Sequence, residues 1–509
     1  MPLAALLALA AAAAPASPLL PPDHWAAAAA ERAHDMGLAP QWMPAQRAVP
    51  IAVVAEALKA AAAHAETFSL PLVHAWWRRF QEEFPRWPVE ETRSPASPVA
   101  TSEVGQRSPS PATAGEGRGE GPFPALLYAN TALGYRAGWL HELPPAVPER
   151  PWALHLTAPD SEPFLDASAA AAYGPHLAAA AELLLTPSAV DLPSLELVLA
   201  AGPVSLSVGR APVRYGPAQV GGVVMGGGAA IRRVEAMTTE PVRLPYLEWL
   251  GAFALDLALA RFEESRHPYT PLLWSFQLSW RPHPRLTLAA IRGFMFGGAI
   301  WEGIGASDGA LAILGIKNVP HSGNNVYSGS VRWRLPTEAA LPLTARLEWG
   351  TDDNPGAAFN WPGLLAGLST PLVPGTPVAL GFEWAFFDKS GIGHHNGPIT
   401  WYSHGEYVGG WATGQAPLGD PLGGNGRAWR LVAAADLLDA RLHLDAVGAV
   451  NERRPDNLYA PQAGGRSVGA SGQAEWRQGR YALGVRGRYE QGDAGWHRGD
   501  LTIRANVSL

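Results

Sequence analysis

The strongest constraint on the fold is an alternation of apolar and polar residues that recurs along the C-terminal part of the sequence. Val204, Leu206 and Val208 alternate with serines, and residues 343–349 and 378–386 repeat the pattern. Because successive side chains of a β-strand point to opposite faces, each such segment predicts a strand with one apolar face. Turn-forming runs separate the segments, at residues 281–284, 352–355, 423–426 and 491–493.

The strands of a soluble β-sandwich would show the same alternation. The composition of the two strand faces is therefore needed to distinguish a sandwich from a transmembrane barrel. One face is apolar in segment after segment, whereas the other carries arginine, glutamate and glycine, which favours a transmembrane barrel with lipid outside and water inside. Residues 501–509 form a last alternating segment that resembles the signal recognised by barrel assembly. At roughly 20 residues per strand and connection, a barrel over residues 123–509 would contain about 18 to 20 antiparallel strands.

The first residues are typical of a signal peptide. An apolar run from Leu3 leads to Ala14-Pro15-Ala16, which predicts a signal peptide over residues 1–16, cleaved after Ala16. No later stretch has the roughly 20 unbroken apolar residues of a membrane-spanning helix. We therefore expect an exported protein of the outer membrane.

A small α-helical periplasmic domain is expected over residues 17–92. Asp23 is placed to cap a first helix, which Gly37 would end. A second helix is expected at about 50–64 and a third at about 70–84, where aromatic residues recur at the helical spacing typical of core packing.

Residues 93–122 are rich in serine, proline, glycine, glutamate and arginine. Such a composition buries too little apolar surface to form a core, so it predicts a disordered linker or loop.

Composition excludes several classes of function. Only 16% of the 509 residues are charged and the net charge is −7, which argues against nucleic acid as a partner. The absence of cysteine excludes disulfides, zinc–thiolate sites and a cysteine nucleophile. No nucleophile elbow or phosphate-binding loop is present. We expect no enzymatic activity, no cofactor and no metal.

A longer run of motifs is more specific than any periodicity. A strand ends in Gly209-Arg210, and an aromatic-Gly-Pro turn, an apolar pair and two prolines follow it. These are Tyr215-Gly216-Pro217, Ala229-Ala230, Pro241 and Pro245. Further segments follow in order at residues 272–298, 346–353 and 401–426. The set resembles the capsule-assembly Wzi family of outer-membrane proteins, although the family's usual tryptophan before Gly-Pro is Tyr215 here.

The resemblance implies an eighteen-stranded barrel in outer-membrane lipid. It also implies a lectin-like, non-catalytic role in which the protein holds capsular polysaccharide at the cell surface. A porin-like channel for acidic saccharides or other small solutes is the alternative function.

The N-terminal segment resembles an S-layer-homology domain in Asp23, His24, Trp25 and Gly37 and in its helix-turn-helix spacing. Such domains grip cell-wall glycan partly through an Arg- and Glu-containing motif. Residues 50–53, at the aligned place, have neither residue. Peptidoglycan binding and packing at the periplasmic mouth of the barrel therefore both stay open.

Two groups of residues are candidates for glycan contact. His395, Trp401, Tyr402, His404 and Tyr407 cluster in one loop-rich stretch, where aromatic faces could stack on sugar rings. The alternative is an interfacial aromatic girdle with solvated loop residues. The histidines of this stretch could also hold a metal, but no regular spacing supports a metal site.

The second group is basic. Arg210, Arg214 and Tyr215, followed by Arg232 and Arg233, suggest a positively charged patch inside the barrel that would suit an acidic polysaccharide. The alternative is a network of ion pairs in the lumen. Its carboxylates would be Glu235, Glu240 and Asp256.

Overall fold

The computed structural model describes most of the chain. The described residues are 15–68, 70–84, 125–141, 159–262, 270–298, 307, 311, 323–338, 340–352, 363–387, 401–403, 407, 409–414, 416–459 and 462–508. The predicted linker at 93–122 and nearly all of the predicted signal peptide lie outside these residues.

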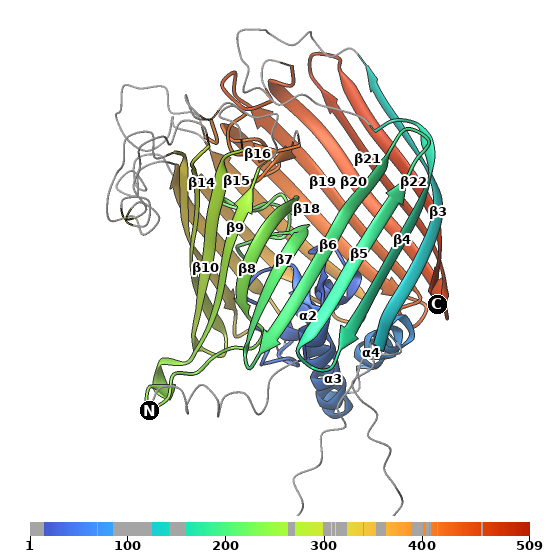
Figure 1. Cartoon of the computed structure of the whole chain (residues 1–509), viewed down its shortest axis with the longest axis vertical. Helices are drawn as coiled ribbons and strands as arrows, with labels where there is room; N and C mark the ends of the chain where they lie inside the picture. The colour runs from blue at the N-terminus through green and yellow to red at the C-terminus, as the bar shows by residue number, and fades with distance from the viewer. Residues whose placement is uncertain are drawn as a thin grey trace, which may run out of the picture.

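Eighteen antiparallel strands form a closed barrel (Figure 1), which confirms the predicted fold class and strand number. Each strand pairs with its neighbours in the chain order of the barrel, and the last strand pairs with the first, Ser508 opposite Asn130. The strands are β3 (Ala125–His141), β4 (Glu162–Tyr173), β5 (Leu177–Leu185), β6 (Val190–Ala201), β7 (Val204–Pro212), β8 (Ala230–Thr238), β9 (Ala252–Arg261), β10 (Leu272–His283), β11 (Leu286–Phe296), β12 (Asn325–Arg334), β13 (Thr344–Asp352), β14 (Gly363–Thr370), β15 (Val378–Phe387), β18 (Gly426–Leu437), β19 (Leu442–Arg453), β20 (Gly465–Gln478), β21 (Tyr481–Gly492) and β22 (His497–Ser508).

The alternation of the sequence corresponds to the two faces of the wall. Val204, Leu206 and Val208 are exposed on the outside, whereas the intervening Ser205 and Ser207 are buried inside. Exposed leucine, valine, tryptophan and tyrosine side chains continue around the barrel in the same register. Such an apolar outer band, on a barrel whose backbone is hydrogen-bonded all round, is what a lipid bilayer requires.

The two ends of the barrel differ in their connections. Short turns join the strands at one end, as at residues 174–176, 202–203 and 479–480, whereas at the other end longer stretches of sequence separate consecutive strands, 28 residues between β11 and β12 and 38 between β15 and β18. Short turns are typical of the periplasmic end and longer loops of the extracellular end. Among the described residues, no helix is both long enough and apolar enough to cross a bilayer.

The N-terminal part folds into three helices, α2 (Trp25–Asp35), α3 (Ile51–Phe68) and α4 (Pro71–Glu83). The expectation that Asp23 caps the first helix is wrong. The helix begins one residue later, and the Nδ1 atom of His24 accepts the backbone N–H of Ala26 at 3.2 Å. Gly37 ends the helix as expected, with a φ of 86° that favours glycine.

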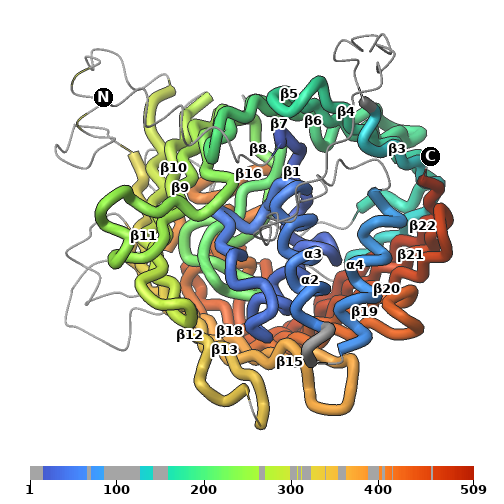
Figure 2. Tube along the Cα trace, turned by 90° about the horizontal axis from the view of Figure 1, so that it is seen from below, coloured from blue at the N-terminus to red at the C-terminus, as the bar shows by residue number. Residues whose placement is uncertain are grey.

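These helices and their connections, residues 15–84, lie inside the barrel at its periplasmic end, and we call them the plug (Figures 1 and 2). A two-stranded ribbon, β1 (Leu19–Leu20) with β2 (Val49–Pro50), links the ends of the plug's first half. Trp76 and Phe80 of α4 belong to one apolar cluster with Leu127 and Ala170 of the wall. A fully buried side chain such as Phe80 contributes about 1.5–3 kcal/mol, so this cluster holds the plug in the lumen.

Carboxylates of α2 connect the plug to one side of the wall. Asp35 accepts hydrogen bonds from Arg332 of β12 at 2.6 Å and from Arg346 of β13 at 2.9 Å. Glu31 accepts from Arg47 of the plug at 2.7 Å and from Arg346 at 3.3 Å. Burial alone would raise the pKa of Glu31, but the three arginines lower it well below its usual range. Both carboxyls are therefore charged, and removal of an arginine would leave a buried charge unpaired.

Arginines of the plug connect it to a neighbouring part of the wall, formed by β18–β20. Arg32 donates to Asp436 of β18 at 2.5 Å, and the indole N–H of Trp76 donates to the same carboxylate at 3.0 Å. Arg79 of α4 donates to Glu475 of β20 at 2.7 Å. The plug is thus fixed by charge pairs on two sides, through residues of opposite sign.

His34 gives the plug a testable pH dependence. Its buried ring donates from Nδ1 to the carbonyl of Ala39 at 2.8 Å, and burial, with Arg332 and Arg281 nearby, lowers its pKa to about 3. Between about pH 3 and 6.5, the unfolded chain binds a proton that the folded chain does not. Stability should therefore fall as the pH drops through this window, by up to about 1.4 kcal/mol per pH unit.

We expect His34→Asn, whose amide can donate to the same carbonyl, to flatten the pH dependence of unfolding between pH 6.5 and 4.5. Tryptophan fluorescence during denaturant unfolding in detergent would measure it. The carboxyl of Glu31 in the unfolded chain begins to take up protons near the lower end of this window, but it does so equally in both proteins, so the difference between them reports on His34. An unchanged pH dependence in the variant would contradict the assignment.

Candidate glycan-binding cavity

The connection between β7 and β8, residues 213–229, folds into the lumen, and we call it the inner loop. Glu383 of β15 accepts the backbone N–H groups of Gln219 at 2.7 Å, Val220 at 3.2 Å and Gly221 at 3.1 Å. Glu348 of β13 accepts the N–H of Val223 at 3.1 Å. Two inward-facing acidic side chains of the opposite wall therefore hold the backbone of the inner loop by hydrogen bonds.

A second inward segment, residues 401–425, packs over the inner loop. The hydroxyl of Tyr402 donates to the carbonyl of Val223 at 2.7 Å, and the indole of Trp411 donates to the carbonyl of Val224 at 2.6 Å. The short ribbon β16 (Ala412–Thr413) and β17 (Ala416–Pro417) belongs to this segment. Arg430 of β18 donates hydrogen bonds to Glu383 of β15 and to Asp420 of the segment, each at 2.8 Å. This arginine therefore connects the segment to the carboxylate that also holds the inner loop.

Three of the aromatic residues predicted to contact glycan lie in this buried cluster. Trp401 is 2% exposed, and Tyr402 and Tyr407 are fully buried. Trp401 meets the ring of Phe387 edge-on, with 5.1 Å between ring centroids. Because the rings point into the barrel, they form no girdle at the lipid interface. Their glycan contact stays a prediction, and it would require the segment to open.

The buried Tyr215 and the partly buried Arg214 belong to the inner loop. The hydroxyl of Tyr215 donates to Asp256 at 2.6 Å, and burial beside that carboxylate raises the pKa of Tyr215 well above its usual value. Arg214 donates to the carbonyl of Gln219 at 2.7 Å. Burial and the neighbouring Arg47 lower the pKa of Arg214 to about 10. In this arrangement both side chains stabilise the inner loop.

The expected basic patch inside the barrel is not a single feature. Arg233 faces inward and pairs with Glu235 at 2.7 Å, as in the alternative of an ion-pair network. Arg210 and Arg232 lie opposite one another in the register of β7 and β8, on the outer face of the wall. Their inclusion in an inner patch was wrong, because the outward parity of Val208 continues to Arg210 without a bulge.

The predicted residues His395 and His404 lie outside the described residues. Within the part of the chain that the structure describes, no three histidine or acidic side chains come together as a metal site would require.

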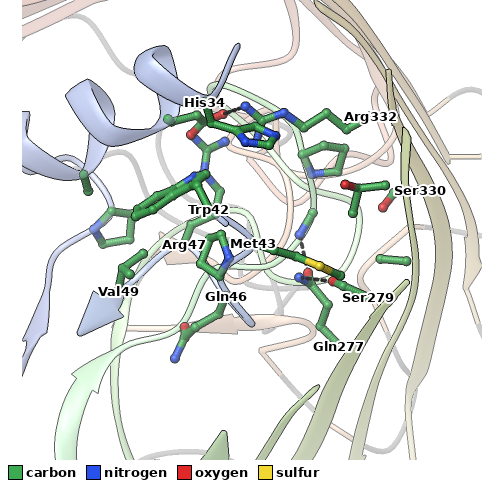
Figure 3. Close-up of a pocket in the computed structure, with 18 of the residues that line it drawn as sticks. His34, Trp42, Met43, Gln46, Arg47, Val49, Gln277, Ser279, Ser330 and Arg332 are labelled. Carbon is green, nitrogen blue, oxygen red and sulfur yellow. Dashed lines mark hydrogen bonds and ion pairs between the residues drawn. The ribbon is translucent and has the colours of Figure 1, made fainter. Parts of the chain in front are cut away.

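Between α2 and the wall formed by β10–β12 lies a small cavity of about 80 Å³ (Figure 3). His34, Trp42 and Arg47 of the plug and Gln277 and Arg332 of the wall line it. Gln277 already donates to the carbonyl of Ala45 at 2.9 Å. The volume is far below that of a sugar-binding pocket, so this cavity is a packing gap at the plug–wall contact.

A larger cavity of about 570 Å³ lies between the plug and another part of the wall, and the ion pair of Glu83 with Arg477 of β20 borders it. The plug contributes residues 19–25 and 83–84, and strands β3–β8 and β19–β22 contribute the rest. Tyr128 and Phe164 give it apolar rings, and Asp166 and Glu182 give it carboxylates. The volume is in the range of small-ligand sites.

Arginines of β21 and β22 face this side of the lumen and remain accessible. Their side chains are exposed by 67% for Arg486, 45% for Arg488 and 44% for Arg504. Arg488 bonds Asp500 at 2.7 Å, whereas the nearest carboxylate of Arg486 is the exposed Asp23 at 3.7 Å. The sequence reasoning missed these three residues, although their alternation with Leu483 and Val485 indicates an inward position.

Together these features define an outer-membrane β-barrel whose lumen is partly filled by an N-terminal plug and two inward segments. The sequence profile described as "Capsule assembly protein Wzi" matches residues 197–494, which is more than half of the chain. The chain therefore belongs to the capsule assembly Wzi family.

The fold is shared with a solved structure. Wzi of Escherichia coli, described as an outer-membrane protein involved in group 1 capsule assembly and a carbohydrate-binding β-barrel, superposes with a TM-score of 0.68 at 13% identity, over 97% of this chain and 99% of that chain. OccK5 (OpdH) of Pseudomonas aeruginosa gives a TM-score of 0.46 at 11% identity, over 76% of this chain and 98% of that one. A search of curated protein sequences found no match. The S-layer-homology resemblance has no support from these comparisons.

Gly216 tests how tightly the inner loop is held. Its φ is +82°, and a Cβ atom there would meet the carboxylate of Glu348. Gly375 has a similar φ of +78° and open space around it, so Gly375→Ala is the matched control. Both alanines adopt a left-handed backbone that costs roughly 1–2 kcal/mol, but only Gly216→Ala also displaces a buried carboxylate.

We expect Gly216→Ala to lower the denaturation midpoint more than Gly375→Ala and to speed tryptic cleavage at Arg214. If the two variants were equally destabilised and cleavage at Arg214 were no faster, the inner loop would not be held tightly at Gly216.

Proposed function

We propose that the protein binds acidic surface polysaccharide at the cell surface without catalysis, and that the glycan occupies the cavity beside the plug. The observation that carries the proposal is the pair of accessible, inward-facing arginines, Arg486 and Arg504, on the wall of a cavity of about 570 Å³, with Arg488 two residues further along β21. Membership of the capsule assembly family supports this substrate class, and so does the similarity to a carbohydrate-binding barrel.

The charges of the cavity suit a reversible ligand. Ion pairs between exposed side chains contribute about 0–1 kcal/mol, so a uronate carboxylate can replace Asp23 beside Arg486 at little cost. Arginine presents a planar fork that bonds carboxylates through two N–H groups. The rings of Tyr128 and Phe164 supply apolar surface for sugar rings, as lectin-like sites require.

A porin-like channel is the second candidate, and the same cavity is the observation that favours it. The plug and the two inward segments fill the other side of the lumen. Any passage for solutes would therefore run beside the plug, along the cavity.

The glycan site can be tested with size-defined oligosaccharides of hexuronic acids and their carboxyl-reduced forms. We expect Arg486→Gln/Arg488→Gln to weaken binding of the acidic form at least about tenfold, since each charged hydrogen bond contributes about 1.5–3 kcal/mol. Arg480→Gln, at the periplasmic turn before the same strand, is the matched control and should bind like the wild type. Equal binding of acidic and reduced oligosaccharides would contradict the proposal, as would normal binding by the double variant.

Planar-bilayer recording separates the binder from the channel. A protein whose lumen serves as a binding site should show no large steady current, because the plug is fixed on two sides by buried charge pairs. A steady current that acidic saccharides block, and that the double variant alters, would favour the channel.

A further inference from the structure

The connection between β8 and β9, residues 239–251, is the longest connection at the periplasmic end of the barrel, and we call it the hook. It projects from the lower rim of the wall in Figure 1. It contains Pro241 and Pro245, the two prolines of the sequence motif, and the one-turn 3₁₀-helix η2 (Glu248–Leu250). None of its residues lines the glycan cavity or the small cavity beside α2. The hook therefore has no part in the glycan binding proposed above.

The hook is held along the outer face of the wall. Val242 and Phe253 exchange two backbone hydrogen bonds, at 2.7 Å and 2.8 Å. The indole N–H of Trp280 donates to the carbonyl of Leu250 at 2.6 Å. Trp280 points to the outer face of β10, because the preceding Ser279 is buried on the inner face. Its ring also stacks on that of Phe253, with 6.4 Å between ring centroids and 7° between planes. These contacts place the hook beside an outward aromatic pair and not beneath the lumen.

The tip of the hook exposes apolar side chains. Tyr246 is 98% exposed and Trp249 is 76% exposed, and Leu244 and Leu247 beside them are exposed as well. Tyr246 has a φ of 68°, in the left-handed region that residues other than glycine rarely adopt. The backbone thus holds this ring outward in a strained conformation. Large apolar groups that gather in one short exposed segment mark a contact surface, whereas scattered single ones need no explanation.

The hook continues the lipid-facing surface of the barrel. Val204, the first residue of β7, is exposed on the outer face and lies directly opposite Thr238, where β8 ends and the hook begins. Phe253 and Trp280 lie opposite one another at the same end of β9 and β10. The apolar outer surface therefore reaches the strand ends next to the hook. In membrane barrels, aromatic residues border the apolar band at each interface, and the hook lies at such a border.

We propose that the hook is a membrane anchor whose apolar tip, residues 244–249, inserts among the phospholipids of the periplasmic leaflet. Lipid is the occupant that fits, because the tip is continuous with a surface that already contacts lipid. Tyrosine and tryptophan rings combine an apolar body with a polar edge, and they favour the headgroup region of a bilayer. Arg243 and Glu248 are exposed in the same connection, and an interfacial position leaves both charges in contact with headgroups or water.

Strand β9 joins the anchor to the plug. Ala252 and Ala254, at the start of β9, belong to one buried cluster with Met43 and Ala45 of the plug. The hook holds the outer side of the same strand end. This part of the periplasmic rim is therefore held between lipid on the outside and the plug on the inside.

The protein contains no cysteine, so a single introduced cysteine can carry a nitroxide label without other changes. Tyr246→Cys and Trp249→Cys, labelled and reconstituted in liposomes of phosphatidylethanolamine and phosphatidylglycerol, test the proposal by electron paramagnetic resonance. Oxygen concentrates in the bilayer, whereas a nickel chelate present on both sides stays in water. We expect more collisions with oxygen and fewer with the chelate than for a label at Asp439→Cys. Asp439 is the matched control, since it is an exposed turn residue at the same end with a φ of 56°.

Heat-modifiable migration shows whether each variant folds. Labels at positions 246 and 249 that meet the chelate as often as the label at 439 would overturn the proposal. So would labels that are protected from both reagents, because protection from both indicates cover by protein, from a second copy of the chain or from a partner.

Tryptophan fluorescence tests the anchor without a label. In liposomes of lipids brominated near the headgroup, the wild type should lose a larger fraction of its fluorescence than Trp249→Phe, because the indole at 249 lies within reach of the bromine. Trp333→Phe removes an exposed tryptophan of the outer wall and is the positive control. The same fractional quenching in the wild type and in Trp249→Phe would contradict an anchor at this position.

Discussion

An inward-facing charge on the barrel wall has to meet either water or an opposite charge, and this requirement organises the lumen. On the β12–β13 side, arginines of the wall form ion pairs with Glu31 and Asp35 of α2. On the β18–β20 side, Asp436 and Glu475 of the wall pair with Arg32 and Arg79 of the plug, and Arg477 of the wall pairs with Glu83. The plug therefore fits in one orientation only, because reversal would place like charges together in a site of low dielectric.

The same requirement explains what the family motifs do here. The carboxyl groups of Glu348 and Glu383 are buried in the lumen, and the inner loop supplies backbone N–H groups to both. Tyr215 and Tyr402 bond Asp256 and the inner-loop backbone respectively. The aromatic-Gly-Pro turn and the tryptophan- and tyrosine-rich segment thus shape the filled side of the barrel, and a ligand is left to the side where the wall charges are still accessible.

The sequence predicts the features that depend on neighbours along the chain. Alternation identifies the outward residues, and the helix starting at Ile51 follows Pro50 as its first-turn signal indicates. Features that depend on distant segments escape it. Trp401 is buried in a cluster with inner-loop residues far away in sequence, such as Val223. The sequence alone does not show this contact, so it predicted an accessible aromatic site for glycan. The outward direction of Arg210 is predictable from the sequence, because Arg210 follows Val208 by two residues in the same alternating segment.

The face of the strand on which an arginine lies, and the side of the barrel next to it, decide the surroundings of its charge. Arg233 faces inward on the filled side, so it is buried and its charge is used by Glu235. Arg486 faces inward on the open side, where its charge is accessible to a soluble ligand. Arg232 is adjacent to Arg233 in sequence but points to the outer face of the wall. The face of the wall on which an arginine lies, and the side of the lumen next to it, therefore decide whether its charge is buried in an ion pair, accessible in the lumen or outside the barrel.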